Sequence, residues 1–81
     1  MDQVEATIIW TAFEDVAPNL CYIHRTREFL EDLLEETEDT GHLLELLEVE
    51  LARIENPSFR TDMRILGERI KRYRKQAPLE G

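Results

Sequence analysis

The sequence predicts an all-α fold: a small bundle of three or four helices built round an antiparallel C-terminal helical hairpin. Apolar residues recur every three or four positions along most of the chain, which is the period of a helix with one buried face. Only three Gly and three Pro interrupt the 81 residues, and 42% hydrophobic with 35% charged residues is typical of amphipathic helices. We therefore expect a single helical domain over residues 1–81.

The first predicted helix spans residues 3–16. Its apolar residues keep a helical spacing until Pro18 stops the pattern: Val4, Ile8, Ile9, Ala12, Phe13 and Val16. The β-branched stretch at residues 7–11 also suits a strand, but an isolated strand would find no partner elsewhere in this chain. The spacing therefore favours a helix.

Two further helices are predicted at residues 19–38 and 42–55. Asn19 is a suitable cap for the second helix, which Gly41 is expected to end. Asp39 or Thr40 is the candidate cap of the third helix. The apolar stripes that define the two helices are Ile23, Thr26, Leu30, Leu33 and Thr37 in one, and Leu44, Leu47, Leu51 and Ile54 in the other.

The fourth predicted helix covers residues 58–76 and has the most regular apolar seam, formed by Phe59, Met63, Leu66, Ile70 and Tyr73. Folding residues 42–55 back on it about Pro57 brings two seams of matching register together, as an antiparallel hairpin requires. Gly67, inside this helix, is interpreted as a contact point between helices, with a tolerated surface glycine as the alternative. Residues 77–81 are expected to fray.

Charge is unevenly distributed along the chain. Residues 1–59 carry fifteen Asp and Glu against three Arg, while residues 60–81 carry seven Lys and Arg against three Asp and Glu. An acidic body is thus followed by a basic last helix, which indicates recognition of a partner without naming one. The net charge of −8 opposes nonspecific attraction to nucleic acid or anionic lipid.

An acidic cluster along the outside of the second helix is the candidate partner-binding surface. It consists of Glu28, Glu31, Asp32, Glu35, Glu36, Glu38 and Asp39. The helix dipole disfavours negative charge near a helix C-terminus, so stability does not account for these carboxylates. The functional interpretation is a surface that meets a basic groove on another protein, as nucleic acid phosphates would. The structural interpretation is a solvated face that keeps the protein soluble.

The alternative candidate surface is the basic helix, with Arg64, Arg69, Lys71, Arg72, Arg74 and Lys75. The helix dipole also favours cations at this end, so these residues are expected even without a ligand. Residues 51–66 superficially resemble a helix-turn-helix signature, but that register would bury the carboxylates of Glu55 and Asp62 and expose the apolar seam. A DNA-binding regulator is therefore the alternative function, and nucleic acid is a less favoured partner than protein.

The sequence predicts no catalytic residue, metal site or cofactor. Cys21, His24 and Glu28 share one helical face, but three ligands from a single helix rarely form a site. The Glu-x-x-Glu spacings lack the Glu-x-x-His partner of di-iron bundles, and there is no glycine-rich phosphate loop or paired cysteine motif. We therefore do not expect an enzyme.

The predicted function is that of a small acidic regulator, an inhibitor, adaptor or chaperone, which binds another protein through its helices. Doubled apolar positions such as Leu33/Leu34 and Leu46/Leu47 exceed what one hairpin seam covers and predict a homodimer. A single cysteine and the absence of a signal peptide or membrane span predict a cytoplasmic protein without membrane association. The candidate aromatic anchors of an interface are Trp10, Phe13, Tyr22 and Phe29.

Overall fold

The computed structural model describes residues 1–76, which contain four α-helices, one 3₁₀ helix and no strand. In chain order the elements are α1 (Gln3–Val16), η1 (Ala17–Asn19), α2 (Ile23–Glu36), α3 (Thr40–Leu51) and α4 (Pro57–Gln76). The predicted all-α class is confirmed, and residues 7–11 are helical rather than a strand. The predicted frayed tail, residues 77–81, lies outside the described residues.

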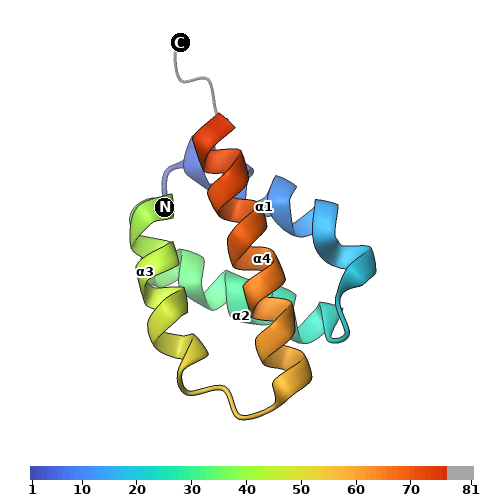
Figure 1. The fold of residues 1–81 in the computed structure, drawn as a ribbon. Coiled ribbons are helices and arrows are strands. Elements are labelled where there is room, and N and C mark those ends of the chain that lie inside the picture. The colour runs from blue at the N-terminus through green and yellow to red at the C-terminus, as the bar shows by residue number, and fades with distance from the viewer. Residues whose placement is uncertain (77–81) are drawn as a thin grey trace.

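Helix α4 is the central element of the bundle (Figure 1). Helices α1 and α3 lie on either side of it, and α2 crosses behind. The chain runs along α3 and returns along α4 in the opposite direction. The packing of α4 against α1 is nevertheless more extensive than its packing against α3. The first helix is therefore the main neighbour of α4, and it is not an addition to a C-terminal hairpin.

The predicted seam of α4 is confirmed at Phe59, Met63, Leu66 and Ile70, which are all buried, while its last residue, Tyr73, is half-buried. The other helices contribute their buried apolar side chains to the same core: Ile9, Ala12, Phe13, Val16, Leu30, Leu33, Leu43, Leu44 and Leu47.

On α1 the predicted apolar face is wrong at one position. Val4 is 67% exposed, because the residue in line with Ile9, Ala12 and Val16 in the first turn is Glu5 and not Val4.

The boundaries of α2 differ from the prediction. Residues 17–19 form η1, so Asn19 does not cap α2, which begins at Ile23. Gly41 does not end α2 either, because this helix stops at Glu36 and Gly41 lies in the first turn of α3. The predicted cap of α3 at Asp39 is confirmed, since its side chain accepts the backbone N–H of His42 at 2.8 Å.

Helix α3 ends at Leu51, four residues before the predicted end at residue 55. Asn56 caps the start of α4: its side-chain oxygen accepts the backbone N–H groups of Ser58 at 2.8 Å and Phe59 at 3.1 Å. The earlier end of α3 is visible in its last hydrogen bonds: the backbone N–H groups of Arg53 and Ile54 donate to carbonyls three residues back, those of Glu50 and Leu51, instead of four. The side chain of Arg60 also donates to the carbonyl of Ile54 within the connection between the two helices.

Gly67 is a contact point between helices, as predicted. It is buried, and a Cβ atom at this position would lie 3.2 Å from Cδ2 of Leu47 on α3. The missing side chain therefore lets Leu47 pack directly on the backbone of α4. Within residues 1–76 no helix combines the length and the apolar character needed to cross a membrane.

Candidate functional site

The carboxylate of Asp62 is bound into the interior of the fold. Its side chain on α4 is only 1% exposed and accepts the backbone N–H groups of Cys21 at 3.0 Å and Tyr22 at 2.8 Å. These donors immediately precede α2, so the carboxylate brings negative charge to the positive end of that helix dipole. Asp62 thus fixes the start of α2 from a helix forty residues further along the chain.

The burial of Asp62 bears on the resemblance of residues 51–66 to a helix-turn-helix signature. That register is disfavoured in part because it would bury Asp62, yet Asp62 is buried in this fold, where two backbone donors satisfy its carboxylate. Glu55 is exposed, and Phe59 and Met63 are buried, as the seam of α4 predicts.

Glu5 binds the beginning of α3 in a similar way. Its carboxylate accepts the backbone N–H of Thr40 at 2.9 Å and also the hydroxyl of the same residue. Thr40 is the first residue of α3 and is fully buried. Helix α1 therefore supplies a second negative charge to a helix N-terminus.

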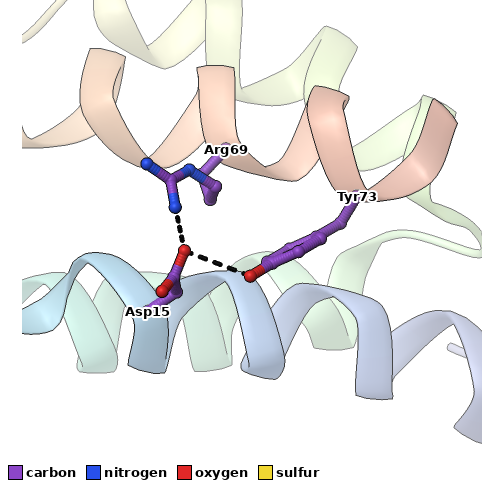
Figure 2. Close-up of polar contacts among 3 residues, drawn as sticks. All are labelled: Asp15, Arg69 and Tyr73. Carbon is purple, nitrogen blue, oxygen red and sulfur yellow. Dashed lines mark hydrogen bonds and ion pairs between the residues drawn. The ribbon is translucent and has the colours of Figure 1, made fainter. Parts of the chain in front are cut away.

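Asp15 joins α1 to α4 at the surface (Figure 2). One carboxylate oxygen accepts hydrogen bonds from the Arg69 guanidinium and, at 3.1 Å, from the Tyr73 hydroxyl. The ion pair is about one-third exposed on each side. Arg69, one of the candidate basic residues, is thus engaged by the fold.

The other candidate cations of α4 divide into two groups. Lys71 Nζ lies 3.9 Å from a Glu48 oxygen and 3.7 Å from a Glu68 oxygen, and the Arg74 guanidinium lies against Gly41. The second group is exposed and, within residues 1–76, forms no ion pair; its members are Arg64, Arg72 and Lys75. Among the described residues, only part of the predicted basic surface is therefore left without an ion-pair partner.

The acidic cluster of the second helix also divides. Five carboxylates lie on one side of α2 at positions i, i+3, i+4, i+7 and i+8: Glu28, Glu31, Asp32, Glu35 and Glu36, here called the acidic stripe. All five are exposed, and among the described residues none forms an ion pair or a side-chain hydrogen bond. Glu38 is exposed in the connection after α2, whereas Asp39 serves as the cap of α3.

A groove of about 690 Å³ borders the acidic stripe where α2 meets the connection from α3 to α4. Its apolar lining is Phe29, Ile54 and the buried Phe59, the stripe contributes Glu28 and Asp32, and Arg25 and Arg53 line it as well. Phe29 and Phe59 pack edge to face, with ring centroids 5.9 Å apart. The acidic stripe thus lies beside apolar surface and not only beside solvent. We call this the stripe groove.

The candidate aromatic anchors have different environments. Phe13 is buried and packs edge to face with the half-buried Trp10. Tyr22 is 37% exposed, and Phe29 is half-buried in the stripe groove. Phe13 is therefore a core residue and not an interface anchor.

The predicted excess of exposed apolar surface is mostly covered within the chain. Leu33 and Leu47 are buried, while their neighbours Leu34 and Leu46 are half-buried against the core. The doubled apolar positions thus no longer support a homodimer. Cys21 is exposed, and nowhere in residues 1–76 are three His, Cys, Asp or Glu side chains grouped so as to hold a metal ion.

Comparison with known proteins identifies a family. Residues 11–75, from the middle of α1 almost to the end of α4, match the sequence family described as the MJ1579 family. The chain belongs to the MJ1579 family. This matched region includes the acidic stripe, the stripe groove and Asp62, while Glu5 precedes it. No curated protein and no solved structure matches the chain.

Proposed function

We propose that this member of the MJ1579 family is a small regulator, of the inhibitor, adaptor or chaperone type, which binds another protein through the acidic stripe of α2. The observation that carries the proposal is the contrast among the carboxylates. Glu5, Asp15 and Asp62 each bind a group from a distant part of the chain, whereas the stripe carboxylates are exposed and unpaired among the described residues. Within residues 1–76 the stripe carboxylates therefore make no polar contact that would stabilise the fold.

Electrostatics supports a role outside the fold. Like charges three or four residues apart on a helix repel one another by about 0.2–0.5 kcal/mol per pair. Glu35 and Glu36 are the last residues of α2, where the helix dipole also disfavours negative charge. A basic surface on a partner would relieve both effects and would accelerate association.

The stripe groove supports a partner that is not purely ionic. Phe29 and Ile54 are half-buried there, next to Glu28 and Asp32 of the stripe. Interfaces take most of their affinity from a few apolar or aromatic anchors, with charges at the rim. We therefore propose a partner segment that presents Lys or Arg side chains around one large apolar residue.

The test compares variants of equal charge in affinity capture from an extract of the native host. The stripe variant is Glu31→Gln, Asp32→Asn, Glu35→Gln and Glu36→Gln, and the matched control replaces the exposed residues Asp2, Glu14, Glu45 and Glu68 by their amides. We expect the stripe variant to lose the captured protein, at least about tenfold, and the control to retain it. The salt dependence of capture should be flatter for the stripe variant.

Substitutions in the basic helix α4 give the result that would contradict the proposed surface. If Arg64→Gln, Arg72→Gln and Lys75→Gln together abolish capture while the stripe variant retains it, the proposed surface is wrong. A shift of random duplex DNA that weakens steeply with salt, and that these same three substitutions remove, would favour the DNA-binding alternative.

A further inference from the structure

A second groove, of about 650 Å³, runs between α3 and α4. Its apolar lining includes the half-buried Leu51 and, at the floor, the buried side chains of Leu47 and Met63. The side chain of Leu47 packs onto Gly67, so α3 and α4 approach each other closely at the floor of the groove. We call this the hairpin groove, and it is distinct from the stripe groove.

The two walls of the hairpin groove differ in charge. On α3 the charged lining residue is Glu48, whereas α4 contributes Arg60, Arg64 and Lys71 against one carboxylate, Glu68. The ions within the groove are weakly paired: Lys71 lies 3.9 Å from Glu48 and is half exposed, and the side chain of Glu48 is 73% exposed. Pairs of this kind contribute little to folding and leave the ions available to a partner.

We propose that the hairpin groove is the interface of a homodimer, with a second copy of this chain as its occupant. A two-fold axis parallel to the groove places α3 of each copy over α4 of the other, so that the acidic wall meets the basic wall twice. An axis across the groove would instead place α3 on α3 and α4 on α4, with like charges opposed. A two-fold interface has to be self-complementary, and the charge division of the walls meets that requirement in one orientation only.

Exposed apolar surface beside the groove supports the same occupant. Ala52, which follows Leu51 at the end of α3, lines the groove in an exposed position. The partner's α4 would cover this edge in the proposed orientation. This proposal is independent of the acidic stripe, which lies on α2 and stays outside the interface.

Charge reversal across the axis tests the proposal. Glu48 and Lys71 lie at the same height on facing walls, so in the dimer each Glu48 faces the Lys71 of the other copy. Sedimentation equilibrium from about 1 to about 100 µM should show a dimer for the unaltered chain. Glu48→Lys and Lys71→Glu should each raise the dissociation constant at least about tenfold, because two like-charged contacts replace two attractive ones.

Mixing the two variants gives the decisive measurement. In a mixed dimer one contact joins the two altered side chains and the other joins the two unaltered ones, and both contacts are attractive. An equimolar mixture of Glu48→Lys and Lys71→Glu should therefore recover the dissociation constant of the unaltered chain. The matched controls Glu45→Lys and Arg72→Glu, which reverse exposed charges outside the hairpin groove on the same two helices, should leave it unchanged.

Circular dichroism checks that each variant is folded. If a reversal unfolds the chain, Glu48→Gln and Lys71→Gln replace it, and the expected result is a dimer whose salt dependence is lost. A chain that stays monomeric throughout the series overturns the proposal. It is equally overturned if a groove variant behaves as its control does, or if the mixture fails to recover the dimer.

Discussion

Carboxylates lie on both the outer face of α2 and the inner face of α4, but those on α2 are exposed and the one on the inner face of α4 is buried. On α4 the carboxylate of Asp62 is buried and accepts two backbone N–H groups that precede α2. On α2 itself five carboxylates stand in solvent, and none is paired in the part of the chain that the structure describes. In this acidic chain, a carboxylate is therefore part of the packed interior only where hydrogen-bond donors from another part of the chain reach it.

The contrast between the two faces depends on the inner face of α4 being part of the packed core. Leu66 of α4 is fully buried, and Leu47 of α3 is 2% exposed against Gly67. Leu66→Ala or Leu47→Ala should each lower the free energy of unfolding by about 2–5 kcal/mol, which is a large fraction of the stability of so small a chain. Thermal melts of both variants within about two degrees of the unaltered protein would contradict this packing.

The same region offers the most direct test of a structural carboxylate. Asp62→Ala leaves two N–H groups without their acceptor and should cost about 2–3 kcal/mol. Asp62→Asn keeps one acceptor oxygen and loses the charge, so it should cost less. Urea unfolding with an unchanged m-value measures both. If Asp62→Ala were as stable as the unaltered protein, the carboxylate of Asp62 would contribute no more to stability than a surface carboxylate does.

The sequence predicts the existence of the four helices because the residues that separate them act on their neighbours in the chain. Pro18, Asp39 and Pro57 mark the breaks within residues that are neighbours in the chain. The start of α2 at Ile23 was not predictable in this way, because its preceding N–H groups bind Asp62 forty residues away. A signal for Asp62 was nevertheless present, since it lies three residues after Phe59 and four before Leu66, on the apolar seam.

The candidate site was predictable to a similar degree. The acidic stripe follows directly from helical spacing and is exposed as that spacing implies. The separation of Asp39 from the stripe follows from the cap of α3, which the sequence also suggests. The hydrogen bond from Arg69 to Asp15 joins the last helix to the first, and no local sequence pattern predicts such a pair.

A smaller effect is expected where a carboxylate is bound but exposed. Asp15→Ala removes the partner of Arg69 and Tyr73, yet the ion pair is about one-third exposed and should contribute about 0.2–1 kcal/mol. The matched control is Glu14→Ala, at the neighbouring exposed position of α1. Chemical denaturation should show a loss for Asp15→Ala and none for Glu14→Ala. Equal losses would mean that the contacts in Figure 2 contribute nothing specific.

The smallest effect is expected on the outer face of α2, and it has the opposite sign. Replacing Glu31, Asp32, Glu35 and Glu36 by their amides removes like-charge repulsion along the helix and negative charge near its C-terminus. The melting temperature should therefore stay the same or rise by at most about 2 °C. A fall of several degrees would show that the fold uses these carboxylates. The contrast with Asp62 would then disappear, and with it the reason to assign the stripe to a partner.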